Sequence, residues 1–195
     1  MKKHNIRIVG GVYRRTPIPV IDAHGLRPTP DRIRETLYNW LGYFWNQNFK
    51  DKTILDLFAG TGALGFEAAS RGAAHVQMVE SNPQAVNALR TLRTKLKAGN
   101  VRVFPGDAMH VLERTANPFD LILLDPPFGQ NWLDRLWHKL PAVLTADGLV
   151  YVESENPVIP PANYETLRAG RAGQVHYVLL QIVAPQDNKL QAELH

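Results

Sequence analysis

The sequence predicts an α/β protein with a doubly wound, Rossmann-like sheet that is mostly parallel and ends in an antiparallel C-terminal hairpin. Three observations predict it. Short apolar runs alternate with amphipathic segments between residues 53 and 154, a glycine-rich loop follows the first run, and only strand-like segments follow residue 163. Alternating strands and helices with right-handed crossovers give a parallel sheet covered by helices on both faces.

A small extension is expected in front of this sheet. Residues 6–20 read as two short strands with glycine and proline between them, which predicts a hairpin. The segment 27–45 then becomes helical, because apolar residues recur at helical spacing after Pro30. We therefore predict a basic hairpin extension over 1–26, the main domain over 27–185 and a polar tail over 186–195.

The remaining elements follow in order along the chain. Each strand is a short apolar run, and several helices end near a glycine. The expected strands are 53–58, 75–80, 101–104, 119–125 and 148–154, the expected helices are 62–72, 83–99, 107–115 and 132–144, and the closing hairpin is 163–169 with 174–183.

Composition bounds the function. The chain has 195 residues, 45% of them hydrophobic, and no cysteine. Its longest apolar runs fall far short of the ~20 residues of a membrane helix, and without cysteine there are neither disulfides nor thiolate metal sites. The seven histidines form no ligand-like cluster. We expect a cytoplasmic monomer without metal or membrane association.

Positive charge gathers at the N-terminus. Residues 1–35 hold eight Lys or Arg against three acids, in a chain whose net charge is +4. A basic arm on a nearly neutral body favours a polyanionic partner such as a nucleic acid. A solvated basic terminus is the alternative.

The stretch "DLFAGTGALG" predicts a cofactor site. Gly60, Gly62 and Gly65 follow a strand and open a helix, which permits a tight turn and close approach of a ligand to the backbone. Glu80 ends the next strand and suits ribose hydroxyls. The Asp56 carboxylate would repel a pyrophosphate, and it suits the ammonium and sulfonium groups of S-adenosylmethionine. The alternative is a structural carboxylate that caps N–H groups of the loop. Asp107 is placed to meet an adenine amine, to cap the following helix, or both.

The stretch "LILLDPPFGQ" (121–130) predicts a second part of the site. Proline lacks an N–H, so Pro126 and Pro127 stop the strand and form a rigid elbow. The Asp125 carboxylate and the Pro126 carbonyl suit the two N–H groups of an exocyclic base amine, and Phe128 suits stacking on the base. Trp132 is a further candidate to flank it. A plain strand-terminating turn is the alternative.

With these motifs in view, the chain resembles the rRNA small subunit methyltransferase D family among class I S-adenosylmethionine-dependent methyltransferases. The similarity rests on "RIVGGVYRRTPIPV", "LRPTPDRIRETLYNWL", "DLFAGTGALGFEA", "DPPF", "YVESE" and "AGQVHYVLLQ". The resemblance implies methylation of guanine N2 near position 966 of 16S rRNA, in an assembled or nearly assembled 30S subunit.

The resemblance also implies roles for individual residues. The catalytic residues that it implies are Asp125, Pro126 and Phe128, which are expected to bind and orient the base. The expected cofactor contacts are Asp56, Phe58, Gly60, Thr61, Gly62, Glu80, Asp107 and Ala108. The candidate RNA contacts are Arg7, Arg14, Arg15, Arg27, Arg32 and Arg34, with a solvated helix face as the alternative for the last two.

Rival functions remain at this point. A DNA adenine or protein glutamine methyltransferase uses a similar elbow, although a chain of this length has no separate DNA-recognition domain and Asp125 departs from the usual glutamine version. A dehydrogenase shares the glycine pattern, but Asp56 and the elbow argue against it. A non-catalytic RNA-binding assembly factor leaves both motifs unexplained.

Overall fold

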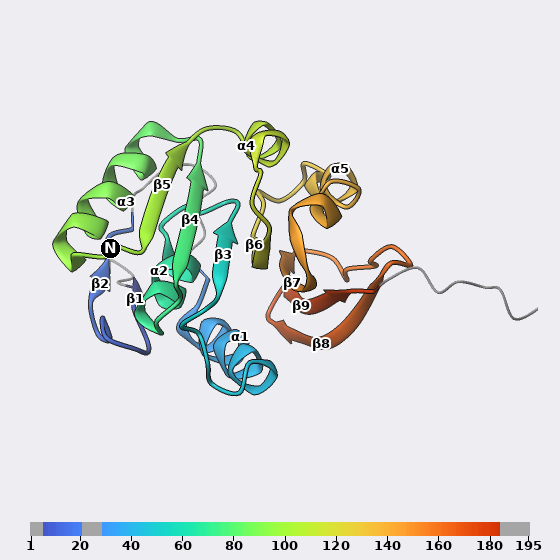
Figure 1. The fold of residues 1–195 in the computed structure, drawn as a ribbon, viewed down its shortest axis with the longest axis horizontal. Coiled ribbons are helices and arrows are strands. Elements are labelled where there is room, and N and C mark those ends of the chain that lie inside the picture. The colour runs from blue at the N-terminus through green and yellow to red at the C-terminus, as the bar shows by residue number, and fades with distance from the viewer. Residues whose placement is uncertain (1–5, 21–28, 184–195) are drawn as a thin grey trace, which may run out of the picture.

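The computed structural model describes residues 6–20 and 29–183. The predicted RNA contact Arg27 and the predicted tail 186–195 lie outside these residues. A seven-stranded sheet runs across the molecule in the order β5-β4-β3-β6-β7-β9-β8 (Figure 1). Its strands are β3 (Thr53–Asp56), β4 (His75–Glu80), β5 (Val101–Pro105), β6 (Phe119–Leu124), β7 (Leu144–Ser154), β8 (Tyr164–Ala172) and β9 (Val175–Ile182).

The first five of these strands in chain order are parallel, and β9 pairs antiparallel with both β7 and β8. The predicted mostly parallel sheet with an antiparallel C-terminal hairpin is therefore confirmed. The chain moves outward from β3 through β4 to β5 and then returns to place β6 on the other side of β3. Such a reversal of strand order opens a crevice at the carboxyl ends of the strands, where ligands bind in this class of fold.

Helices cover both faces of the sheet, as the alternation predicts. Helices α1 (Asp31–Phe44), α2 (Ala63–Ser70) and α3 (Pro83–Leu96) pack on one face, and α4 (Ala108–Arg114) and α5 (Trp132–Leu136) on the other. Alternate residues of each strand supply the two cores: Ile54 joins the first cluster and Leu55 the second. None of the helices within 6–20 and 29–183 is long and apolar enough to cross a membrane.

The N-terminal extension forms the predicted hairpin. Strands β1 (Ile6–Arg7) and β2 (Pro17–Ile18) pair antiparallel, with Ile6 opposite Ile18. The hairpin lies against α2, and Ile8 is completely buried in the same core cluster as α1 and α2. The extension is therefore packed on the main domain.

The helix predicted over 132–144 is wrong in its second half. Helix α5 ends at Leu136, and a short 3-10 helix covers Leu140–Val143 before β7 begins at Leu144. Pro141 explains the break, because proline offers no N–H to an α-helical ladder and disfavours the α conformation in the residue before it.

Candidate functional site

A cleft of about 790 Å³ opens at the carboxyl ends of β3, β4 and β6. It lies where the strand order reverses. Its walls come from the loop after β3, the end of β4, the start of α4 and the elbow after β6. The predicted residues that line it are Phe58, Gly60, Thr61, Glu80, Asp107, Ala108, Asp125, Pro126 and Phe128.

The glycine loop obtains its shape from two left-handed residues. Gly60 has φ 52° and Gly62 has φ 79°, and Gly62 starts α2 as its N-cap. A Cβ on Gly62 would lie 2.5 Å from Leu89 Cδ2 and 2.7 Å from Phe66 Cδ2, so only glycine fits without displacing these side chains. Gly62 thus shapes the loop from behind and is not part of the cleft wall.

Glu80 fixes this loop to the end of β4. Its Oε2 accepts a hydrogen bond from Gly60 N at 2.8 Å, and its Oε1 accepts one from Asn82 N at 2.7 Å. Each carboxylate oxygen has two lone pairs, so these backbone bonds leave room for hydroxyl donors from a ligand. Glu80 thus has a structural role in the loop, and it also lines the cleft, where its binding role stays a prediction.

Asp107 is the N-cap of α4. Its Oδ1 accepts hydrogen bonds from Met109 N at 2.9 Å and His110 N at 3.3 Å. The side chain is exposed and lines the cleft next to the buried Ala108. The capping role is thus present, and the remaining oxygen is available for the predicted contact with a ligand amine.

Asp56 does not line the cleft, although the sequence predicted that it contacts the cofactor. Its side chain is 1% exposed, and its Oδ2 accepts a hydrogen bond from Gly65 N at 2.9 Å in the first turn of α2. Burial raises the pKa of this carboxyl to about 7, with a further increase from Glu80 and Glu153. Asp56 is therefore a structural carboxylate behind the loop and is not part of the cleft wall.

The elbow residues close the other side of the cleft. Asp125 is partly buried directly after β6, Pro126 is buried, and Phe128 is partly exposed. The ring of Trp132 meets Phe58 edge to face with centroids 5.1 Å apart, and both rings line the cleft. The cleft therefore presents aromatic side chains to a flat ligand, next to a carboxylate and a backbone carbonyl.

The charge of the cleft distinguishes between cofactors. Its described lining includes the acids Glu80, Asp107 and Asp125, and no Lys, Arg or His. Carboxylates repel a pyrophosphate and attract an ammonium or a sulfonium. The donor set and the glycine cradle therefore fit S-adenosylmethionine and disfavour a dinucleotide. Within 6–20 and 29–183, no three His, Asp or Glu gather to hold a metal ion, and the absence of a metal stays a prediction.

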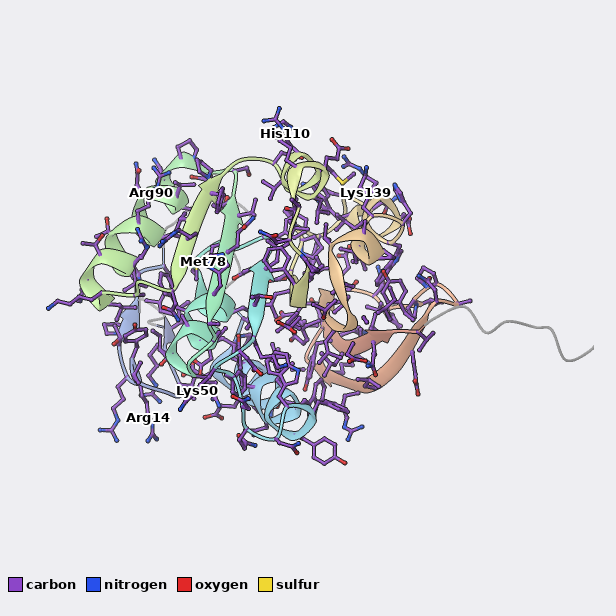
Figure 2. All side chains as sticks on the ribbon, in the orientation of Figure 1. Arg14, Lys50, Met78, Arg90, His110 and Lys139 are labelled. Atoms are coloured by element: carbon purple, nitrogen blue, oxygen red, sulfur yellow. The ribbon has the colours of Figure 1, made fainter. Side chains whose placement is uncertain are left out.

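The candidate RNA contacts divide into two groups. Arg7, Arg14, Arg15 and Arg32 are exposed, and Arg14 extends from the hairpin away from the body of the molecule (Figure 2). Arg34, in contrast, is 0% exposed: its Nη2 lies 2.6 Å from Asp31 Oδ1 and its Nη1 lies 3.4 Å from Glu67 Oε2. The expectation that Arg34 contacts RNA is corrected, because its guanidinium is committed to the interior.

Sequence reasoning missed two buried acids and part of the cleft wall. Glu67 and Glu153 are 0% and 3% exposed, and Thr29 and Asn82 line the cleft. Asn82 carries a readable signal, since Asn before Pro83 is a typical helix N-cap. The hydroxyl of Thr29 donates to Glu153 Oε1 at 3.0 Å, and no local pattern indicates this contact because the two residues lie far apart in the sequence.

Comparison with known proteins agrees with this geometry. The model of the family described as conserved hypothetical protein 95 matches residues 6–181. Ribosomal RNA small subunit methyltransferase D of Escherichia coli K12 is 42% identical over 193 residues, covering 93% of this chain and 95% of that protein. A solved Escherichia coli structure, provisionally described as a methyltransferase, has TM-score 0.81 and 42% identity over 92% of this chain and 99% of that one.

A more distant structure, a methyltransferase solved with SAH, is 16% identical with TM-score 0.63 over 81% of this chain and 50% of that one, which shows the fold alone. Fold and site together define a Rossmann-like methyltransferase that uses S-adenosylmethionine. More particularly, the chain belongs to the family described as conserved hypothetical protein 95 and to the family of ribosomal RNA small subunit methyltransferase D.

Proposed function

We propose that this protein methylates the exocyclic N2 amine of one guanine in 16S rRNA, guanine 966 in bacterial numbering, in assembled or nearly assembled 30S subunits. The observation that carries the proposal is the Asp125-Pro126-Pro127-Phe128 elbow, which shares one cleft with the glycine loop. The name of the Escherichia coli relative supports rRNA as the substrate class. A ribosomal substrate implies a cytoplasmic enzyme.

Bound S-adenosylmethionine supplies an electrophilic methyl group on a sulfonium, which leaves as a neutral thioether. Glu80 is proposed to accept the ribose hydroxyls, Asp107 the adenine amine, and the backbone of Gly60 and Thr61 to approach the cofactor closely. Phe58 and Ala108 provide apolar contact from either side of the cleft.

The elbow is proposed to prepare the base for attack. The lone pair of an exocyclic amine is conjugated with the ring, so the amine is a weak nucleophile. Hydrogen bonds from its two N–H groups to the Asp125 carboxylate and the Pro126 carbonyl localise that lone pair and direct it at the methyl carbon. When the new N–C bond forms, the amine gives up one proton, for which the Asp125 carboxylate is the hydrogen-bonded acceptor. Phe128 and Trp132 hold the ring in place, and positioning of this kind supplies much of a rate enhancement.

The N-terminal hairpin is proposed to bind the RNA backbone. Arg14 and Arg15 lie at its exposed end, and Arg7 is 65% exposed in its side chain. Phosphate contacts of this kind set position and affinity but not sequence. A 30S particle, with its folded RNA, offers such a hairpin more phosphates at once than a short strand does.

The test offers tritiated S-adenosylmethionine and four acceptors: unmethylated 30S subunits, naked 16S rRNA, duplex DNA and a glutamine-containing protein substrate. The proposal predicts label in the RNA of 30S subunits. Label only in DNA or in protein keeps the cofactor and fold but overturns the rRNA assignment.

A further inference from the structure

A second, smaller pocket of about 280 Å³ adjoins the cleft on the far side of the elbow. It is lined by residues 126–134 and by residues 153–159, which form the end of β7 and the segment after it. The two hollows share the residues Pro126, Pro127, Phe128, Gln130 and Trp132. None of the roles assigned above uses this pocket.

Trp132 lines both the cleft and the small pocket, and the side chains of three other residues contact its indole ring. Its Nε1 donates to Gln130 Oε1 at 3.0 Å, and the Phe58 ring contacts it from the cleft. The Arg135 guanidinium lies over the indole with its Cζ 4.5 Å from the ring centroid. The small pocket therefore has a fixed aromatic wall with an exposed positive charge close to it.

The charged side chains in the described lining of the pocket are all carboxyl groups. Glu153 Oε1 accepts from the hydroxyls of Thr29 and Tyr151, both at 3.0 Å, and Glu155 Oε1 accepts from Gly129 N at 3.0 Å. As in the cleft, the described lining contains no Lys, Arg or His. The three carboxyl side chains of the lining, Asp134, Glu153 and Glu155, disfavour a phosphate and favour a ligand that presents N–H donors.

The apolar groups of the pocket suit a flat ring. Trp137 and Val158 contribute to its wall, and Ile159 lies at its edge with 87% of its surface exposed. The volume is just below the ~300 Å³ at which drug-sized ligand sites begin, which suits one heterocycle and not a whole nucleotide. Bases commonly stack on aromatic side chains in single-stranded RNA recognition.

We propose that this pocket binds a nucleobase that neighbours the target guanine in the RNA strand. The inference rests on the proposed function, because only a strand with its guanine at the elbow brings the next base to the other side of Trp132. The base stacks against the indole and donates N–H groups to the carboxylates of Glu153 and Glu155. Its phosphate stays outside, within reach of Arg135.

The test measures binding of a fluorescein-labelled pentanucleotide RNA with a central guanine, by anisotropy, with saturating S-adenosylhomocysteine. Two further RNAs are abasic at either neighbour of the guanine. We expect one of the abasic RNAs to bind wild-type protein about ten-fold more weakly than the intact RNA. Ile159→Asp should weaken intact RNA to a similar extent and remove the difference between intact and abasic RNA.

The matched control is Tyr43→Asp, since Tyr43 is 68% exposed and lines neither hollow. It should retain the ten-fold difference. Equal binding of all three RNAs by wild-type protein, no binding included, overturns the pocket, and so does an unchanged abasic penalty in Ile159→Asp. A different result would overturn the proposed function alone. In that case wild-type protein transfers no methyl group to 30S subunits, although it shows the abasic penalty and Ile159→Asp removes it.

Discussion

At the scale of single residues, two of the aspartates that follow or end sheet strands, Asp56 and Asp125, have opposite surroundings. Asp125 lines the cleft after β6, whereas Asp56 is buried beneath α2 at the end of β3. The proposed chemistry needs a carboxylate at Asp125 that accepts N–H groups. Asp56 instead holds the helix that begins at the glycine loop.

Replacing Asp125 should separate turnover from cofactor binding. Asp125→Ala removes an acceptor for the base amine, so methyl transfer should fall by about a hundred-fold or more, since a lost positioning contact carries such factors. Calorimetric titration with S-adenosylhomocysteine should give a dissociation constant within about three-fold of wild type. Turnover within two-fold of wild type would remove Asp125 from the proposed reaction.

Asp56 should make stability depend on pH. Burial raises its pKa from 3.8 to about 7, so between these values the folded protein keeps a proton that the unfolded chain releases. The free energy of unfolding should therefore decrease as pH rises from about 4 to about 7, by an amount on the order of 4 kcal/mol from this group.

The comparison is Asp56→Asn, whose amide oxygen can still accept from Gly65 N. Urea denaturation at several pH values should give a shallower decrease for this variant. It should not abolish the decrease, because burial also raises the pKa of Glu153 to about 7. A variant with the full wild-type slope would show that Asp56 does not carry the expected proton.

Some residue roles were readable from local pattern and others were not. Glu80, Asp107 and Asp125 all follow or end parallel strands, so their common edge was predictable. Strand alternation places Asp56 on the same strand face as Ile54, which points toward α2 and away from the cleft. The burial of Arg34 had no local signal, since its partner Glu67 lies 33 residues away.

At the scale of elements, Glu67 on α2 fastens the hairpin to the main domain. Its two oxygens accept hydrogen bonds from Val9 N and Gly10 N, each at 2.7 Å, and it pairs with Arg34 and Arg71. Ser70 adds a second fastening, because its Oγ accepts from Tyr13 N at 2.8 Å and its carbonyl accepts from Val12 N at 2.8 Å. The basic arm is thereby held in a fixed position on α2.

Glu67→Gln should loosen this attachment. A buried carboxylate with two arginine partners is lost, and breaking a buried pair of this kind costs about 3 to 5 kcal/mol. Urea denaturation should show the loss, and trypsin should cleave after Arg14 and Arg15 faster than in wild type.

Glu113→Gln is the matched control, because the Glu113 side chain is 57% exposed and pairs with Lys139 at 3.0 Å. An exposed pair is worth about 1 kcal/mol or less. A Glu67→Gln protein as stable and as protease-resistant as the control would contradict the role of Glu67 in holding the hairpin.

The hairpin and α2 were both predicted from the sequence pattern. The contact between them depends on tertiary structure and had no local signature.

At the scale of the whole molecule, positive charge lies on the arm and negative charge in the cleft. The exposed arginines of the hairpin are separate from a cleft lined by three acids. RNA phosphates should therefore contact the arm, while the cleft admits a base and a cationic cofactor. This division follows from composition along the chain, which is why the sequence already predicted a polyanionic partner.

The arm should make RNA binding depend on salt. Each phosphate contact releases counterions, so the logarithm of the KM for 30S subunits should rise with the logarithm of salt concentration. Arg14→Ala combined with Arg15→Ala should reduce this slope by about one to two. The same slope in the double variant and in wild type would place the RNA contacts elsewhere on the surface.

Identification of the methylated nucleoside tests the proposed reaction most directly. Unmethylated 30S subunits are incubated with the protein and S-adenosylmethionine, and the digested 16S rRNA is analysed by mass spectrometry and primer extension. We expect N2-methylguanosine at a single position, guanine 966 in bacterial numbering, and its formation about a hundred-fold slower or more with Asp125→Ala. A methyl group on another base, or on guanine at an atom other than N2, would contradict it.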